Sequence, residues 1–438
     1  MKFYLIPVVL VVVAAILASG CTAPASQNAG GQPGSHEIRV DALVDETGSL
    51  SVQGGEAKAA LLLAESDINR YYQNLGSPTR VRVVIHDTGS NPATALAITK
   101  QLYANGTRMI LGQQSSAELA AIKDFTDANG MLVWATGSTA HSLAIRNDSI
   151  FRLLSSDRAQ GTVMGIMLAA QNMKAIVPVY RGDIWGDDLT NVTGQTFMAN
   201  GGVTLEGVRY DHATRDFNAT VSQLDIRAGQ AIAKYGAGST AIYAVTLGEL
   251  GDIMNEAATK PNLTKVRWFG CDGNTGIPAL KGNSTAARFA SDVKLTGTIW
   301  GAPLGMDYTG IQSGLGHEPD GGTVALYDGL WITKDVLMDN QGSPMTRNGL
   351  AEALIRHTNT YVGASGPMVL NAAGDRQLAS YDIVRVVSGP TGSQWKKVNQ
   401  IVIWQTGEID VFSYPESTTR NDNFRSEDLK NIHTPISY

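Results

Sequence analysis

From residue 38 onward, the chain alternates short apolar runs with longer segments whose apolar residues recur at helical spacing. The run IRVDALV (38–44) is typical of a buried strand, and the segment 54–72 places its apolar residues on one helical face. The alternation continues as far as MLVWATG (131–137). Because strands that alternate with helices form parallel crossover units, this pattern predicts a parallel sheet covered by helices.

A second α/β unit follows. It begins near residue 161 and ends with the strand-like run KVRWFGCDG (265–273). Beyond it, 321–339 and 348–363 have helical spacing, and 381–412 is typical of strands with a hairpin turn at QTGE. A chain of 438 residues is too long for one ordinary core. Two doubly wound units in one chain therefore predict two lobes with a cleft between them.

The N-terminus has the features of a secretory signal, which we assign to residues 1–20. Lys2 precedes an apolar run from Tyr4 to Leu17, which is shorter than the roughly 20 residues a membrane-spanning helix needs. The small residues before Cys21 resemble the lipobox of bacterial and archaeal lipoproteins, although Leu17 lies four places before the cysteine rather than three. This resemblance implies that Cys21 becomes a lipidated N-terminus.

Two other interpretations of this segment stay open: an ordinary secreted protein that discards Cys21, and a simple membrane anchor. Residues 21–36 are small, polar and rich in Gly and Pro, which is typical of a flexible linker. The net charge of −6 becomes −7 once Lys2 is removed with the signal, so no basic excess favours nucleic acid as a partner.

The sequence lacks the common motifs of enzymes and metal sites. Its seven histidines show no zinc-binding spacing, and GxSxG, P-loop and complete dinucleotide motifs are absent. Cys271 has no intrachain disulfide partner if Cys21 is lipidated. We therefore expect a protein that is not an enzyme and needs no metal or organic cofactor.

Two loops at the ends of predicted strands are suited to binding an anion. Gly112 to Ser116 leads into a helix, where free N–H groups and the helix dipole attract negative charge. Ser115 and Ser116 add hydroxyl donors, although one of them can simply cap the helix. The loop 136–139 offers further polar groups at the same sheet edge, where open α/β sheets bind ligands.

Over residues 37–412 the chain resembles the branched-chain amino acid-binding proteins of ABC transporters, which have the type I periplasmic-binding fold. The segments that carry the resemblance, in order, are TGSLSVQGGEAKAALLLAESDIN, HDTGSNPATALAITKQL, ILGQQSS, GSTAHSL, YRGDIWGDDL, WFGCDGNTG and GPMVLNAAGDR. The resemblance implies two doubly wound, parallel-sheet (Rossmann-like) α/β lobes joined by a three-segment hinge.

The implied lobe crossings fall near residues 154, 275 and 380. Lobe one would then comprise residues 37–153 plus 276–379, and lobe two would comprise 154–275 plus 380–415. The remaining residues, 416–438, form a polar C-terminal tail that resembles nothing identified.

The family resemblance also implies a ligand site. Ser115 or Ser116, together with the hydroxyl and N–H of Thr139, would donate to an α-carboxylate. The carbonyl of Gly137 would accept a hydrogen bond from the ligand's ammonium. Asp272 would pair with that ammonium, at a position where the family usually has Glu. An Asp before Gly is also common in turns, so a purely structural role stays open.

The ligand's side chain would meet residues that differ from the family pattern. Trp185 lies where many members have Tyr, and would close over the ligand unless it only packs in its loop. Gln53 lies where some relatives have an aromatic residue, and Thr246 or Leu247 occupies the matching loop of lobe two. Leu247 with Trp185 favours an apolar ligand, whereas Gln53 favours a polar one.

These features predict an extracytoplasmic solute-binding protein, tethered to the outer face of the cell membrane through lipidated Cys21. It would capture an amino acid or a similar small molecule by hinge closure and deliver it to the permease of an ABC importer. A ligand-binding component of a membrane signalling receptor is the alternative, because the fold serves both roles.

Overall fold

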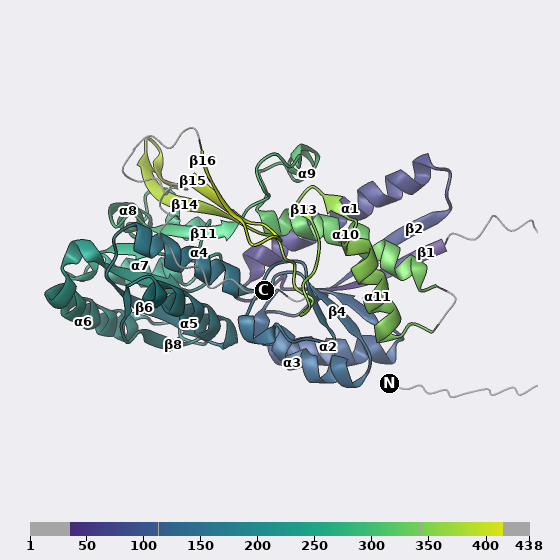
Figure 1. Ribbon diagram of the computed structural model, residues 1–438, viewed down its shortest axis with the longest axis horizontal. Helices are drawn as coiled ribbons and strands as arrows, with labels where there is room; N and C mark the ends of the chain where they lie inside the picture. The colour runs from purple at the N-terminus through teal and green to yellow at the C-terminus, as the bar shows by residue number, and fades with distance from the viewer. Residues whose placement is uncertain (1–35, 113, 342–343, 415–438) are drawn as a thin grey trace, which may run out of the picture. The chain divides into compact units, whose positions relative to one another are not determined.

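The computed structural model describes residues 36–112, 114–341 and 344–414 (Figure 1). The predicted signal peptide, Cys21, linker residues 22–35 and the tail 416–438 lie outside the described residues, whereas His36, expected in the linker, begins the first strand. Within the described ranges, no helix combines the length and apolar character needed to cross a membrane.

The first sheet has five parallel strands in the order β2-β1-β3-β4-β5. The strands are β1 (His36–Val44), β2 (Thr79–Asp87), β3 (Met109–Leu111), β4 (Leu132–Ala135) and β5 (Ile150–Arg152). The connecting helices are α1 (Ser51–Asn74), α2 (Pro92–Ala104) and α3 (Ser116–Ala128), followed by the 3₁₀ turn η1 (His141–Leu143). The predicted strand–helix alternation up to residue 137 is therefore confirmed.

Local sequence signals explain these helices. In α1, buried positions such as Ala57, Leu61, Ala64 and Ile68 follow one helical face onto the sheet. Helix α2 begins with an Asn91 cap, whose side chain accepts two backbone N–H bonds, followed by Pro92.

Later parts of the chain return to this first sheet. Helix α10 packs beside α1 and β1, and α11 contacts β4 (Figure 1). The returning elements are α9 (Thr309–Leu315), α10 (Gly321–Asp339), α11 (Arg347–Thr358) and the short pair β12 (Val362–Gly363) and β13 (Gly366–Pro367).

The second sheet is mixed, with the order β16-β15-β14-β11-β10-β9-β6-β7 and β8 paired to β6. Pairings among β6 to β11 are parallel, whereas those that join β11, β14, β15 and β16 are antiparallel. Its strands are β6 (Ala175–Gly182), β7 (Val203–Thr204), β8 (Val208–Asp211), β9 (Thr240–Val245), β10 (Arg267–Phe269), β11 (Thr296–Trp300), β14 (Ala379–Gly389), β15 (Gly392–Ile403) and β16 (Ile409–Ser413).

Helices of this second part connect its parallel strands. They are α4 (Asp157–Ala170), α5 (Ile184–Ala199), α6 (Asn218–Tyr235), α7 (Leu250–Ala257) and α8 (Thr285–Asp292), with 3₁₀ turns η2 (Ala237–Ser239), η3 (Leu263–Lys265) and η4 (Pro278–Leu280). The α/β class with two sheets agrees with the predicted architecture.

Sheet membership differs from the predicted lobe assignment between residues 276 and 300. Strand β11 pairs with β10, and Leu280, Phe289 and Leu295 share an apolar cluster with β9 and β10. These residues were expected in lobe one. They instead add one more strand–helix–strand crossover to the second sheet, so the chain leaves this sheet after Trp300 rather than near 275.

Candidate functional site

The loop from β3 to α3 is shaped by a glycine and a serine cap. Gly112 has φ +126°, and a Cβ atom there would collide with the carbonyl oxygen of Leu43 on β1. Ser115 caps α3, and its hydroxyl accepts a hydrogen bond from the Glu118 N–H at 3.5 Å. The capping role that the sequence left open is therefore present at Ser115.

Ser116 is buried and connects this loop to the next one. Its hydroxyl oxygen accepts three hydrogen bonds from the loop after β4: from Ser138 Oγ at 2.9 Å, Thr139 N at 3.2 Å and Ala140 N at 3.1 Å. The N–H of Thr139, which the family resemblance assigned to the ligand, is thus already bonded to Ser116. In this structure the two loops therefore bond to each other.

Thr139 nevertheless lies at a junction with the start of α4. Its carbonyl accepts a hydrogen bond from the N–H of Asp157 at 2.7 Å, and its hydroxyl is within hydrogen-bonding reach of the Asp157 carboxyl group. Gly137, two residues earlier, is partly exposed and packs against Gln114. Of the predicted residues in this loop, Thr139 therefore lies beside an acidic side chain.

Asp157 was not predicted as a site residue. It is 1% exposed, and no described residue donates a hydrogen bond to its Oδ2 atom. Burial and the negative charge of Asp272 raise the pKa of Asp157 well above its usual range. The sequence pattern placed the helix start at residue 161, whereas α4 begins at Asp157. The sequence Ser156-Asp157, an N-cap serine followed by an acid, was the signal that could have revealed it.

Asp272 approaches the same place from the end of β10. Its Oδ1 accepts a hydrogen bond from the N–H of Gly273 at 2.9 Å. Asp272 keeps some exposed surface, but burial of its carboxyl group raises its pKa to about 6, partly opposed by a hydrogen bond from Gln160. The negative charge of Asp272 contributes to the raised pKa of Asp157, so the two acids share one electrostatic environment.

Trp185 and Leu247 pack beside Asp272. A Cβ atom on Gly273 would lie 2.6 Å from Cη2 of Trp185 and 2.8 Å from Cδ2 of Leu247. Glycine at 273 therefore lets the indole and the leucine cover the backbone next to the acid. Thr246 is fully buried and its hydroxyl oxygen accepts a hydrogen bond from Asn274 at 3.0 Å.

Gln53 lies in the first turn of α1 and is partly exposed. Its carbonyl accepts a weak hydrogen bond from Nε2 of Gln114 at 3.4 Å, which connects the start of α1 to the loop before α3. No described contact joins Gln53 to Trp185 or Asp272.

Direct contacts also join elements of the two sheets. Oδ2 of Asp188 on α5 accepts a hydrogen bond from the N–H of Ser142 in η1 at 2.7 Å. Ile184, at the start of α5, packs against the apolar cluster that contains Leu119 and Ala135. The N-terminal turns of α5 are thus held against the loops of the first sheet.

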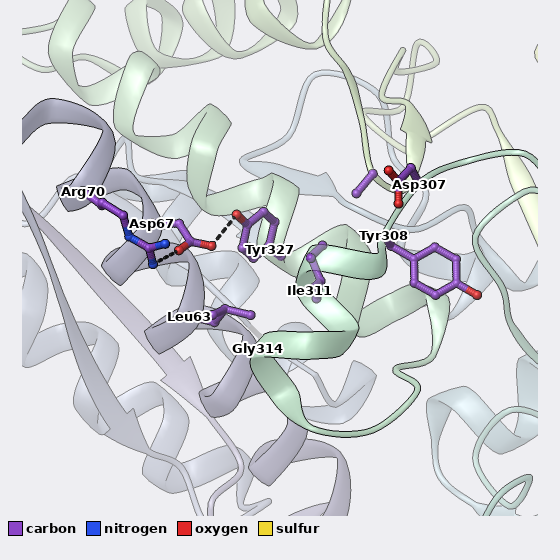
Figure 2. Close-up of a pocket in the computed structure, with 10 residues that line it drawn as sticks. Leu63, Asp67, Arg70, Asp307, Tyr308, Ile311, Gly314 and Tyr327 are labelled. Carbon is purple, nitrogen blue, oxygen red and sulfur yellow. Dashed lines mark hydrogen bonds and ion pairs between the residues drawn. The ribbon is translucent and has the colours of Figure 1, made fainter. Parts of the chain in front are cut away.

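Two surface cavities among the described residues lie away from the predicted site residues. One, of about 420 Å³, is formed by α1, α9 and α10, and Figure 2 shows Tyr327 and Arg70 both bonded to Asp67 at its wall. The other, of about 350 Å³, lies along α5 and β6. Neither is lined by any of the predicted site residues. Among the described residues, no group of three or more His, Cys, Asp or Glu side chains is arranged to hold a metal ion.

Comparisons with known proteins identify the fold and the family. The periplasmic binding protein family model matches residues 37–251. An uncharacterized protein of Methanocaldococcus jannaschii is 27% identical over 424 residues, which cover 91% of this chain and 98% of that protein.

Solved structures of similar fold bind different solutes. A leucine-binding protein of Thermotoga maritima aligns with a TM-score of 0.64 and 19% identity, covering 86% of this chain and 99% of its own. An ABC transporter solute-binding protein of R. palustris in complex with benzoate aligns with a TM-score of 0.66 and 16% identity, over 82% and 96%. These neighbours are solute-binding proteins rather than enzymes. Residues 37–251 thus match the periplasmic binding protein family, and the fold is that of the periplasmic binding proteins of type I.

Proposed function

We propose that this protein captures a small molecule with an α-amino acid head group outside the cytoplasm and presents it to an ABC importer. The observation that carries the proposal is a buried acid, Asp157, whose N–H bonds to the Thr139 carbonyl and whose pKa is raised in part by the charge of Asp272. The two acids arrive from separate segments, one from the start of α4 and one from the end of β10.

An ammonium group is the ligand feature that best suits this pair. Burial of the two carboxyl groups outweighs the nearby charge of Arg152, which is paired with Asp375, and disfavours ionisation, as the raised pKa values of both acids indicate. A bound ammonium would supply the missing positive charge and three hydrogen-bond donors. A ligand with a carboxylate alone, such as the benzoate bound by the R. palustris protein, would supply neither.

The carboxylate of the ligand would lie on the first-sheet side. The N-terminus of α3 and the hydroxyls of Ser115 and Thr139 provide polar groups there, although the Thr139 N–H is bonded to Ser116. Trp185 and Leu247 would cover the aliphatic part of the ligand and exclude water. Closure would follow from contacts to both lobes, which favour the closed state over the open one.

The proposal also includes a lipid tether and a transporter partner. The signal-like residues 1–20, Cys21 and the linker 21–36 support a lipid tether on the outer face of the membrane. The family match supports an ABC permease as the partner.

A thermal-shift screen over amino acids, amides, short-chain acids, aromatic acids and sugars tests the ligand class. A ligand at a hundred times its dissociation constant adds about 2.7 kcal/mol of stability, which raises the melting temperature visibly. We expect compounds with both a carboxylate and an amine to give the largest shifts.

Asp272→Asn should weaken binding of the best ligand by about 2–4 kcal/mol, on the order of 30- to 1000-fold, because it removes a charge-assisted hydrogen bond. Asp292→Asn, an exposed position at the end of α8, is the matched control and should bind normally. If a carboxylate without an amine binds best and Asp272→Asn leaves its affinity unchanged, the ligand does not pair an ammonium group with Asp272.

A further inference from the structure

A second pair of buried acids lies beneath the loops of the first sheet and is not used by the proposed site. Asp45 directly follows β1, and Glu118 lies in the first turn of α3. Their exposed fractions are 1% and 0%. Neither oxygen of Glu118 nor Oδ2 of Asp45 accepts a well-formed hydrogen bond from the described residues, although Thr88 and the Asn91 N–H lie near enough to Glu118 to lower its pKa in part. Such an arrangement is costly unless the acids satisfy one another.

The two carboxyl groups lie within hydrogen-bonding reach of each other. The other oxygen of Asp45, Oδ1, already accepts a hydrogen bond from the Thr88 hydroxyl at 2.9 Å. If both acids were ionised, two negative charges would face each other in the protein interior without a counter-ion. A single proton between them removes one charge and supplies the missing donor.

We infer that Asp45 and Glu118 share one proton, and that this carboxyl–carboxylate hydrogen bond positions the first turn of α3 against the connection from β1 to α1. The pair acts through other residues and touches no ligand. The backbone N–H of Glu118 donates to Ser115, so the position of the pair sets that of the serine loop. On the other side, Gly54 of α1 lies directly against the carbonyl of Asp45.

Neighbouring charged groups are engaged with other partners. Glu46 pairs with Lys58 of α1, Asp87 at the end of β2 accepts from Thr47, and Lys123 of α3 pairs with Asp127 and Asp148. At the start of α2, the N–H of Asn91 donates to Thr88. Burial, followed by the charge of Asp45, raises the pKa of Glu118 to about 8, which agrees with a proton held at neutral pH.

The test is the melting temperature of the full-length protein between about pH 5 and pH 10. An acid with a raised pKa in the folded state stabilises the fold while it keeps its proton. That stability declines as pH rises from the unfolded pKa to the folded one. For Glu118 this window runs from 4.5 to about 8. We expect the melting temperature to fall by on the order of 5–10 °C across the window and then level off.

Glu118→Gln should remove this pH-dependent part, since its amide cannot ionise but can still donate to Asp45. Asp45→Asn should do the same from the other side. Glu352→Gln, an exposed position on α11, is the control and should follow the wild-type profile. A Glu118→Gln profile that runs parallel to wild type would overturn the inference.

If both variants fail to fold, infrared spectroscopy of Asp157→Asn decides, because the pKa of Asp157 in the wild type is also raised. A protonated-carboxyl band that disappears between about pH 7 and pH 9 supports a shared proton at this pair, since the pKa of Glu118 is about 8. The absence of any such loss in this range would overturn it. Neither readout needs a ligand, so failure here is distinct from failure of the proposed function.

Discussion

At the scale of single residues, the environment decides whether a buried aspartate holds its charge. Asp41 on β1 is 3% exposed, and burial alone would raise its pKa. Hydrogen bonds from His86, Arg39 and Thr107 outweigh burial and hold that pKa well below its usual range. Asp272 lacks such cationic donors, and its pKa rises to about 6. The same side chain is therefore a fixed anion in one place and a titrating group in the other.

Ligand affinity should consequently depend on pH through Asp272. A bound ammonium would lower the pKa of this acid, so binding below about pH 6 must expel a proton. We expect the affinity for an amino acid ligand to be constant above pH 7 and to fall toward tenfold per pH unit well below pH 6. Isothermal titration calorimetry in two buffers of different ionisation enthalpy measures the released proton. A flat affinity from pH 4.5 to 8 would contradict the assignment.

Sequence reasoning located the polar residues at the ends of strands but not their bonds. The loop 136–139 was selected because it follows an apolar run, whereas the roles of Thr139 and Asp272 came from the family resemblance. That Ser116 accepts the N–H of Thr139 was not predictable, since the two residues belong to different loops. Asp157 was missed because its helix starts four residues before the apolar periodicity does.

At the scale of elements, helix α5 connects the two halves of the proposed site. Trp185 in its first turn covers Gly273, and Asp188 one turn later bonds to the N–H of Ser142 in η1. One short segment therefore carries both the residue proposed to cover the ligand and a contact between the two sheets. If the lobes close on a ligand, this contact would favour the closed state without touching the ligand.

Asp188→Ala should weaken ligand binding about three- to tenfold, the effect of one hydrogen bond of roughly 0.5–1.5 kcal/mol. We expect the loss mainly in a faster dissociation rate, since the closed state becomes less favourable. Stopped-flow fluorescence of the tryptophans measures it. The neighbouring Asp187→Ala is a matched control, because its exposed pair with Arg209 stays within the second sheet. Equal effects of the two variants would count against the closure contact.

The positions of most helices and strands were predictable from the sequence. Strand β11 is an exception, because no strand was predicted there. Its sequence TGTIW contains two threonines that are fully buried, Thr296 and Thr298. Hydrogen bonds satisfy these hydroxyls, including one from Gln160 to Thr298 at 3.0 Å. Hydrophobic periodicity considers only apolar side chains. A strand whose buried positions are threonines with satisfied hydroxyls therefore gives a weak strand signal in the sequence.

At the scale of the whole molecule, segments far apart in sequence hold the first sheet together. Arg152 at the end of β5 pairs with Asp375, which lies 223 residues away, and both side chains are buried. The same guanidinium donates to the carbonyl of Ala140 at 2.8 Å. The Arg152–Asp375 pair thus connects the loop that carries Thr139 to a segment near the C-terminal end of the chain.

Arg152→Met should destabilise the protein by about 3–5 kcal/mol, because it leaves the carboxylate of Asp375 buried without a partner. Chemical denaturation measures the change. Arg209→Met removes an exposed pair, with side chains 51% and 43% exposed, and should leave the stability almost unchanged. If both variants lose the same small amount, the buried pair is not a structural support.

The predicted lipid tether at Cys21 would determine where in the cell the whole protein is located. If Cys21 carries the lipid, Cys21→Ala expressed in a host that processes lipoproteins should move the protein from the membrane to the soluble fraction. Cys271→Ala is the matched control, since this cysteine is fully buried beside Thr246 and has no access to the processing machinery once folded. We expect the control to remain with the membrane, as a single buried substitution leaves the N-terminus unchanged. Fractionation followed by intact-mass measurement distinguishes the cases. A chain that begins at lipidated Cys21 is heavier than the same chain without lipid and lacks the mass of residues 1–20. Membrane retention of Cys21→Ala would instead favour an uncleaved apolar segment as the anchor.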